Sequence, residues 1–423
     1  MMKFFLKTIH VSLLFMLLSI GFLIASPAEA ANLNSPQKIR ISWDSIPNAV
    51  MYELVVTNGK SEESRHIVTT KRNIFTTGYE LDVSIFNVEQ NHFYWKVRGM
   101  DINGRPMSQF TEPRLLLQQE INPIRPKVTT QFSKLSYAKL YPVYSWIPVL
   151  RATNYDLQVF YDADNNPYTP DTLIKIDSLS GQTSYDYYDD RPYRQEGTYW
   201  WRVRARNSER QTVGEWSDPD RFSVQHDGAT VAALGDSITH GGGAVSTPPS
   251  DVMYDWETYA AVPIRNLGLS GNTVENMVNR FNDDVLPFHP KILVVFGGIN
   301  NIRLGDKATQ VITGLNRIKY KCLYNNITPV FVTIAPINPQ AMKEVSNINV
   351  APNWRMEQQQ VNAWIKEQRY HVDITGPLTD DIGWLPRRLA VDGLHPDVEG
   401  KKIIGEAIGN YLKENFEVDI KQK

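Results

Sequence analysis

The sequence lacks several features that would point to particular classes of protein. Cysteine occurs once in 423 residues, at Cys322, so no internal disulfide can form. The formal net charge is −2 and both signs are dispersed, without the basic stretch that a nucleic-acid-binding surface needs. The sequence also holds no phosphate-binding glycine loop and no cluster of metal-ligating residues. We therefore expect no nucleic-acid partner, no metal and no other cofactor.

An apolar run near the N-terminus has the features of an export signal. Lys3 and Lys7 precede the run from Val11 to Ala25, and small residues follow it up to Ala30. This pattern predicts a signal peptide over residues 1–30, cleaved near Ala30. A retained N-terminal anchor is the alternative, but the run is short for a bilayer span. We thus expect the mature protein to be secreted or extracytoplasmic, in the cell envelope.

The stretch between residues 35 and 225 contains an internal repeat. Five positions recur at an offset of 103 residues: Trp43, Ala49, Tyr52, Leu54 and Val56 match Trp146, Ala152, Tyr155, Leu157 and Val159. Later in each copy, Tyr94-Trp-Lys-Val-Arg98 matches Trp200-Trp-Arg-Val-Arg204. A repeat of this length is a whole domain, and its period-two apolar pattern is typical of strands. We therefore predict two all-β sandwiches, at residues 35–118 and 123–225.

The aromatic residues of the repeat allow two interpretations. Exposed aromatic faces stack on sugar rings, which would make the sandwiches binding modules for a polymer. Because Trp43, Trp95, Trp146 and Trp201 recur at equivalent strand positions, we expect them in the two cores instead. The Tyr-rich segment 185–193 is either a contact loop or a solvated turn.

Residues 229–415 have a different pattern, in which strand-like and helix-like segments alternate. Strands are predicted at 230–234, 262–267, 291–296, 328–334 and 370–374, and helices near 273–285, 307–325, 354–369 and 398–415. Such alternation predicts an α/β domain built on a parallel sheet with right-handed crossovers.

Two short motifs near the ends of this domain supply a hydroxyl, an imidazole and a carboxylate. Gly235-Asp236-Ser237 follows an apolar strand, and Asp392-Gly-Leu-His395 lies close to the C-terminal helix. A serine hydroxyl attacks well near pH 7 only when a base takes its proton, and imidazole suits that task. Asp392 can orient the ring of His395 and stabilise its protonated form. We predict Ser237 as nucleophile, His395 as base and Asp392 as the orienting acid.

Two further segments carry hydrogen-bond donors. Gly271 follows the second predicted strand, and Asn300 follows the third. Donors aimed at a developing oxyanion are often the largest catalytic contribution, with one donor worth about 3 kcal/mol. We predict an oxyanion hole formed by the backbone N–H groups of Ser237 and Gly271 and the side-chain amide of Asn300. The alternative is that both segments are ordinary turns between strand and helix.

These blocks, in this order, resemble the SGNH hydrolases, the GDSL-type esterase superfamily. The resemblance covers residues 229–415 and implies a flavodoxin-like domain with a five-stranded parallel sheet, and ester hydrolysis through an acyl-enzyme without a metal. One position departs from the family pattern, since Asn301 stands where the third block usually has Asp. We expect this change to alter the bracing of the loop and to leave activity intact. The repeats at 35–118 and 123–225 resemble fibronectin type III modules.

The resemblance leaves the substrate open. Export and the sandwich architecture favour an O-acetyl esterase that acts on a carbohydrate polymer, with contact between the sandwiches and a cell-envelope polymer. A lipid-directed esterase or lysophospholipase is a second hypothesis. A catalytically silent polysaccharide-binding or adhesion protein is a third, which Asn301 alone supports.

Overall fold

The computed structural model describes most of the chain. The described residues are 38–60, 66–84, 92–116, 124–162, 172–180, 185–241 and 251–420. The predicted signal peptide over residues 1–30 lies outside them, as does the 242–250 part of the segment that follows the Ser237 motif. Within the described residues, no helix has the length and apolar content needed to cross a bilayer.

The first β region, residues 38–116, consists of two antiparallel sheets that share one core. β1 (Lys38–Ser42) pairs with β4 (Gly78–Asp82), and the second sheet has the order β3 (His66–Ile74), β2 (Met51–Asn58), β5 (Phe93–Met100), β6 (Arg114–Leu115). Buried side chains from both sheets, among them Ile41, Leu54 and Trp95, form a single apolar cluster. In β1 and β5, buried and partly exposed residues alternate, as expected when a strand presents one face to a core, whereas β2 is buried at every position but the last.

The second β region, residues 124–224, repeats this arrangement. One sheet has the order β11 (Asp186–Tyr188), β8 (Val143–Ile147), β7 (Lys127–Val128). The other has the order β10 (Thr172–Ser180), β9 (Asn154–Asp162), β12 (Gly197–Arg206), β13 (Thr212–Trp216), and β14 (Asp220–Val224) also pairs with β12. A short 3-10 helix, η1 (Phe132–Lys134), packs near β14.

Equivalent contacts in the two β regions confirm the internal repeat. The Tyr52 hydroxyl accepts a hydrogen bond from the backbone of Ile46, and the Tyr155 hydroxyl accepts one from Val149 at the equivalent position. The recurring tryptophans are buried in both copies, with Trp146 and Trp201 fully enclosed. The prediction that these aromatic residues form cores is therefore confirmed.

The α/β domain that follows contains the predicted parallel sheet. Its strand order is β16 (Ile264–Gly268), β15 (Val231–Gly235), β17 (Ile292–Phe296), β18 (Thr328–Val332), β19 (His371–Val372), and every pair is parallel. In chain order this is 2-1-3-4-5, a doubly wound arrangement that reverses beside β15. Ligands bind such sheets at the carboxyl ends of the strands next to that reversal.

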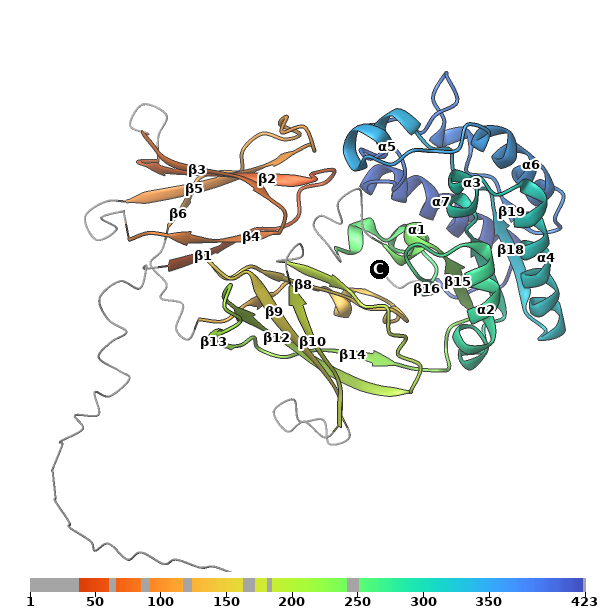
Figure 1. Ribbon diagram of the computed structural model, residues 1–423, viewed down its shortest axis with the longest axis horizontal. Coiled ribbons are helices and arrows are strands. Elements are labelled where there is room, and N and C mark those ends of the chain that lie inside the picture. The colour runs from red at the N-terminus through yellow and green to blue at the C-terminus, as the bar shows by residue number, and fades with distance from the viewer. Residues whose placement is uncertain are drawn as a thin grey trace, which may run out of the picture.

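The helices cover both faces of this sheet (Figure 1). α2 (Val274–Asp284), α4 (Ala308–Tyr324) and α6 (Trp354–Lys366) pack side by side, whereas α7 (Val398–Asn415) packs on the 3-10 helix η3 (Trp256–Tyr259). Each predicted strand and helix of the domain is present, with ends shifted by three residues or fewer. The sequence interpretation missed three short helices: α1 (Ser237–His240), α3 (Ile299–Leu304) and α5 (Pro339–Ser346). Cys322 is buried in α4.

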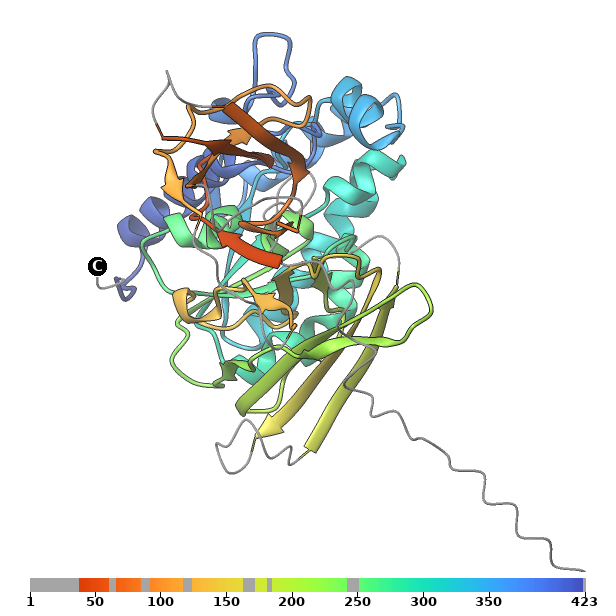
Figure 2. The same cartoon turned by 90° about the vertical axis from the view of Figure 1, so that its left-hand side faces the viewer.

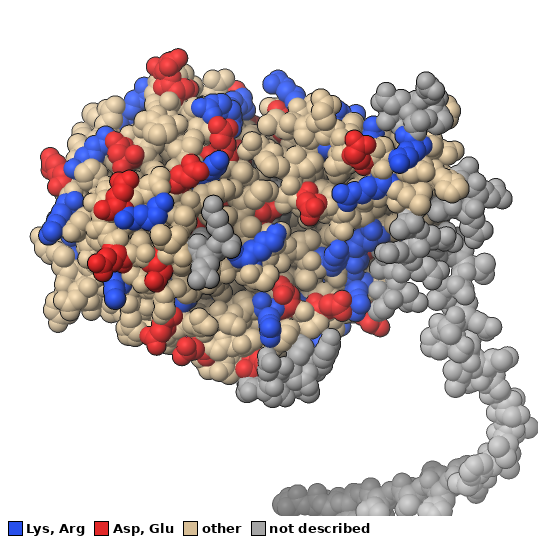
Figure 3. Space-filling model, turned by 180° about the vertical axis from the view of Figure 1, so that it is seen from behind, with Lys and Arg blue, Asp and Glu red and all other residues tan. Residues whose placement is uncertain are grey.

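Both β regions lie against the same side of the α/β domain (Figures 1 and 2). The Tyr254 hydroxyl donates to the carbonyl of Ala49 in the first β region at 2.9 Å. In the second, the Arg194 guanidinium pairs with the buried carboxylate of Asp284 at 2.6 Å. The apolar core of the second β region continues without a break into that of the α/β domain. The predicted boundary near residues 226–228 therefore does not separate two cores. Lys, Arg, Asp and Glu are interspersed on the face in Figure 3.

Candidate active site

The nucleophile motif forms a sharp turn from β15 into α1. All five residues of β15 are buried, as expected for a strand covered on both faces. A side chain at Gly235 would collide with the side chain of Thr239 and the carbonyl of Phe296, so the turn requires glycine there. Asp236 caps α1 by accepting a hydrogen bond from the backbone of Ile238 at 3.0 Å, and burial raises the pKa of its carboxyl to about 6. The turn leaves Ser237 as the first residue of α1, partly exposed.

A continuous series of hydrogen bonds joins Ser237, His395 and Asp392. The Ser237 Oγ lies 2.9 Å from Nε2 of His395, and Nδ1 of the same ring lies 2.7 Å from Oδ2 of Asp392. Asp392 is buried, and its other oxygen accepts backbone hydrogen bonds from Leu394 and His395, both at 2.8 Å. The carboxylate is therefore held on one side of the ring while the serine approaches the other.

This geometry determines which ring nitrogen of His395 carries the proton. The ionised Asp392 carboxylate only accepts hydrogen bonds, so Nδ1 must be the protonated nitrogen. The lone pair of Nε2 then faces Ser237, whose hydroxyl donates to it. A neutral imidazole in this tautomer is ready to take the serine proton.

Gly271 occupies a tight turn beside the nucleophile. Residues 269–272 form the turn, closed by a 3.2 Å hydrogen bond from the backbone of Asn272 to the carbonyl of Leu269. The φ of +79° at Gly271, with Ser270 in an ordinary negative-φ conformation, is that of a type II turn. Leu269 also donates to the carbonyl of Gly235 at 3.1 Å, which ties this turn to the Ser237 motif. Within the described part of the chain, the backbone N–H groups of Ser237 and Gly271 have no acceptor.

Asn300 projects from the start of α3, directly after β17. Its amide nitrogen donates to the carbonyl of Asn272 at 2.9 Å, and its Oδ1 accepts from Nε of Arg303 at 2.8 Å. Because a carbonyl only accepts and a guanidinium only donates, these two contacts fix the orientation of the amide. One N–H of the Asn300 amide is used in this way, and the second has no acceptor among the described residues. The sequence interpretation missed Arg303, since its role depends on a contact one helical turn away.

Asn301, the position that departs from the family pattern, braces two helices. Its Oδ1 accepts from the backbone of Val274 at 2.9 Å, and its amide nitrogen donates to Glu275 at 3.0 Å and to Asp306 at 2.9 Å. An aspartate at position 301 would place a third carboxylate next to those of Glu275 and Asp306. An asparagine suits this position because its amide nitrogen can donate to both acidic neighbours. These hydrogen bonds connect the start of α3 to α2 and to Asp306.

His240 lies three residues after Ser237 and points away from it. Its Nδ1 accepts from the backbone of Ser270 at 3.1 Å, and its Nε2 lies 2.8 Å from the carbonyl of Tyr141 in the second β region. Burial, with a smaller contribution from the nearby ammonium of Lys139, lowers the pKa of this imidazole to about 3. His240 is consequently neutral, and both nitrogens are engaged away from the nucleophile.

The structure places the predicted site residues in two sets. Ser237, His395 and Asp392 are in direct contact, whereas Gly271 follows β16 and Asn300 lies at the start of α3 after β17, and these two are linked through Asn272. Among the described residues, no group of three or more His, Cys, Asp or Glu side chains is placed to hold a metal ion.

In this domain, a serine, a histidine and an aspartate meet at the carboxyl edge of a doubly wound sheet, an arrangement typical of one class of serine hydrolases. Residues 233–403 match the model of the GDSL-like Lipase/Acylhydrolase family, and this part of the chain is a GDSL-type ester hydrolase domain. The match does not extend over the two β regions. No curated protein matches the chain.

Several solved structures are similar to the hydrolase domain. A putative acylhydrolase from Bacteroides fragilis is 20% identical with a TM-score of 0.36, covering 44% of this chain and 86% of that chain. A lipase/acylhydrolase from Enterococcus faecalis is 22% identical with a TM-score of 0.36, covering 46% and 100%. A catalytic mutant of an acetylxylan esterase from Geobacillus stearothermophilus is 20% identical with a TM-score of 0.34, covering 47% and 98%.

Proposed function

We propose that this protein is a serine esterase in which Ser237, His395 and Asp392 are the catalytic residues. The observation that carries the proposal is the unbroken series from the Ser237 hydroxyl through both ring nitrogens of His395 to the Asp392 carboxylate. This order of hydroxyl, imidazole and carboxylate is the one that nucleophilic attack by a serine requires.

The reaction proceeds through a covalent acyl-enzyme. The Ser237 Oγ attacks the ester carbonyl carbon as its proton passes to Nε2 of His395. The protonated ring then donates that proton to the departing alkoxide as the carbon–oxygen bond breaks, and the alcohol leaves. Water attacks the acyl group with His395 again as the base, which releases the carboxylic acid and restores Ser237. Asp392 stabilises the imidazolium in both halves of the cycle.

The oxyanion of each tetrahedral intermediate is stabilised by three donors. These are the backbone N–H groups of Ser237 and Gly271 and the second N–H of the Asn300 amide. Two observations support this assignment: the backbone N–H groups have no acceptor among the described residues, and Arg303 and Asn272 hold the amide in one orientation. Donors that are already oriented cost no reorganisation when charge develops.

For the substrate, we propose O-acetyl groups on a carbohydrate polymer outside the cytoplasm. Two sequence features support this choice: the predicted export signal over residues 1–30, and the pair of β regions, which we assign as fibronectin type III-like modules. These regions place a large additional surface beside the hydrolase domain (Figure 1), where a cell-envelope polymer can make contact. The alternative, a lipid-directed esterase, requires a groove for a long acyl chain.

The catalytic assignment is tested by Ser237→Ala in the full chain, with Ser346→Ala as the matched control. Ser346 is an exposed serine at the end of α5. We expect Ser237→Ala to lose hydrolysis of 4-nitrophenyl acetate by at least about 10³-fold while the fold is kept, because removal of a serine nucleophile can cost up to about 10⁶-fold in kcat. We expect the control to retain full activity. Undiminished turnover by Ser237→Ala would refute the assignment.

The substrate class is tested by acyl-chain length and by acetate release. We expect the acetate ester to be hydrolysed with a higher kcat/KM than the octanoate and palmitate esters, and acetate to be released from acetylated glycans. A preference for the palmitate ester would favour the lipid-directed enzyme. Absence of turnover on every ester would favour a catalytically silent binding protein.

A further inference from the structure

We propose that His240 is a positioning residue for the oxyanion hole, and that the second β region is part of the catalytic unit because it holds this histidine in place. The inference rests on the proposed function, since it concerns how the turn that carries the Gly271 donor is held. It also assigns a role to a β region that lies outside the family match.

The His240 ring joins the turn to the second β region. The Tyr141 atom that faces Nε2 of His240 is the backbone carbonyl oxygen, which only accepts hydrogen bonds, so Nε2 must carry the proton and donate to it. Nδ1 is then unprotonated and accepts from the backbone N–H of Ser270, and it also lies 2.9 Å from the Ser270 hydroxyl. If the ring were protonated, Nδ1 would also carry an N–H and could not accept the hydrogen bond from the backbone N–H of Ser270. The low pKa of His240 agrees with a ring that stays neutral at the pH of catalysis.

The contact to Ser270 matters because of the geometry of the turn. In a type II turn the central peptide is rotated by about 180° from its orientation in a type I turn. Here the central peptide joins Ser270 to Gly271, and it therefore determines where the Gly271 N–H points. A hydrogen bond to the preceding N–H, on Ser270, restricts this rotation from one side.

The other side of the turn is held by Arg280, whose guanidinium donates to the side chain of Asn272 at 2.6 Å and to the carbonyl of Gly235 at 2.9 Å. His240 and Arg280 thus act on the two ends of the same turn. Arg280 belongs to the α/β domain, whereas the support of His240 comes from the β region.

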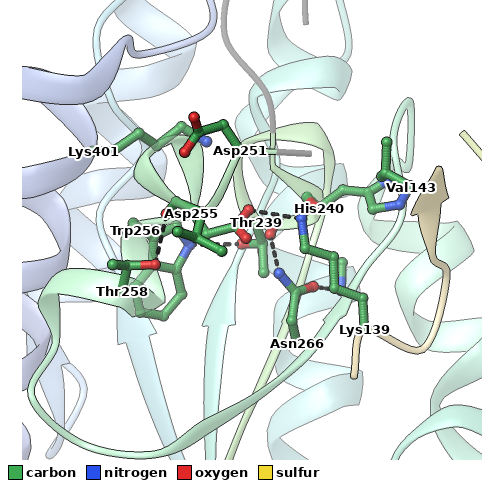
Figure 4. Close-up of polar contacts among 12 residues, drawn as sticks. Lys139, Val143, Thr239, His240, Asp251, Asp255, Trp256, Thr258, Asn266 and Lys401 are labelled. Carbon is green, nitrogen blue, oxygen red and sulfur yellow. Dashed lines mark hydrogen bonds and ion pairs between the residues drawn. The ribbon is translucent and has the colours of Figure 1, made fainter. Parts of the chain in front are cut away.

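The second β region makes several buried contacts around His240 (Figure 4). The Lys139 ammonium donates to the carbonyl of His240 at 2.9 Å and pairs with Asp255 at 2.7 Å, and both side chains are buried. The backbone of Leu140 donates to the carbonyl of Asn266 at 3.1 Å, and the Asn266 amide donates to the carbonyl of Thr239. The segment before β8 therefore contacts both α1, which begins at Ser237, and β16, which precedes Gly271.

Two substitutions separate the two hydrogen bonds of the ring. In His240→Asn, the side-chain oxygen replaces Nδ1 as the acceptor for Ser270 but does not reach Tyr141. In His240→Gln, the amide nitrogen replaces Nε2 as the donor to Tyr141, and the acceptor for Ser270 is lost. Tyr254→Phe is the matched control, because it removes a buried hydrogen bond between the first β region and the α/β domain without touching the turn.

Each variant of the full chain is assayed with 4-nitrophenyl acetate, and its folding is checked by circular dichroism and urea denaturation. We expect His240→Gln to lower kcat about 10- to 100-fold with KM changed by less than about threefold, part of the loss caused by removing an oxyanion donor. The pH profile of kcat/KM should keep its midpoint. His240→Asn should retain at least about five times the kcat of His240→Gln, and Tyr254→Phe should stay within about twofold of the parent.

The order of kcat decides the outcome. If His240→Gln kept the parental kcat, or if kcat in the three variants followed their stability alone, the positioning role would be refuted. Ser237→Ala separates this result from the proposed function. Should Ser237→Ala be inactive while His240→Gln is fully active, only the positioning role fails, whereas an active Ser237→Ala removes the basis of both.

Discussion

Replacement of Asn301 by aspartate tests how this chain accommodates its departure from the family pattern. In the structure, Asn301 is almost fully buried, and its amide donates to the carboxylates of Glu275 and Asp306. Asn301→Asp exchanges that donor for an oxygen that faces both carboxylates. The hydrogen bond from the backbone of Val274 is retained, because the other oxygen still accepts it.

The magnitude follows from these contacts. Hydrogen bonds to charged groups each stabilise by about 1.5–3 kcal/mol, and the lower figure applies because Glu275 and Asp306 are partly solvated. Loss of two such bonds costs about 3 kcal/mol. Repulsion among the carboxylates adds to this, and the new charge at the N-terminus of α2 offsets about 0.5 kcal/mol. We expect Asn301→Asp to lower the free energy of unfolding by about 2–4 kcal/mol at pH 7.

The assay is urea denaturation followed by tryptophan fluorescence at pH 7 and pH 4.5. Repulsion raises the pKa of the new carboxyl, so its protonated form is favoured in the folded state, and the loss should shrink at the lower pH. In a Glu275→Gln, Asp306→Asn background, both neighbours become amides that donate to the new carboxylate, and most of the loss should be recovered. A stability change below about 0.5 kcal/mol at pH 7, or no recovery in that background, would refute the reasoning.

Two further predictions concern the turn and its histidine. A Cβ on Gly271 would meet no atom within 4 Å, so Gly271→Ala should lower the free energy of unfolding only by the strain of the positive φ, about 1–2 kcal/mol. If the turn relaxes to type I instead, kcat on 4-nitrophenyl acetate should fall about 10- to 100-fold. A variant with parental stability and parental kcat would contradict both outcomes. For His240, the pKa falls from its ordinary 6.5 to about 3 on folding, so the unfolded chain binds the extra proton between these values. The contribution of His240 to the free energy of unfolding is complete above pH 6.5 and is lost as the pH falls toward 3. At pH 4.5 this loss is about 3 kcal/mol. The difference in unfolding free energy between the parent and His240→Asn should shift by that amount from pH 7 to pH 4.5, and equal slopes for the two proteins would argue against it.

The sequence alone predicted most of the hydrolase domain, because its signals are local. Apolar runs that alternate with amphipathic segments mark buried strands and covering helices, and the resulting elements were correctly placed. The short helices α1, α3 and α5 were missed, since four to eight residues do not span enough turns to show a helical period. The repeated Trp and Tyr positions likewise predicted the two β cores, since equivalent positions in two copies of one fold have equivalent burial.

The sequence also determined which side chains could carry the chemistry: a serine after the first strand, the Asp392 and His395 pair before the last helix, and donors after the second and third strands. A parallel sheet places the carboxyl ends of its strands at one edge, so these positions converge whenever the domain folds. Tertiary structure alone decided the parts that depend on contacts between distant segments. The burial and neutrality of His240, the amide of Asn301 between two carboxylates and the continuous core shared with the second β region are such features. These features depend on side-chain packing, in which a few ångströms decide whether a polar group has a partner. The separation of two residues along the sequence does not give the distance between them in the folded protein.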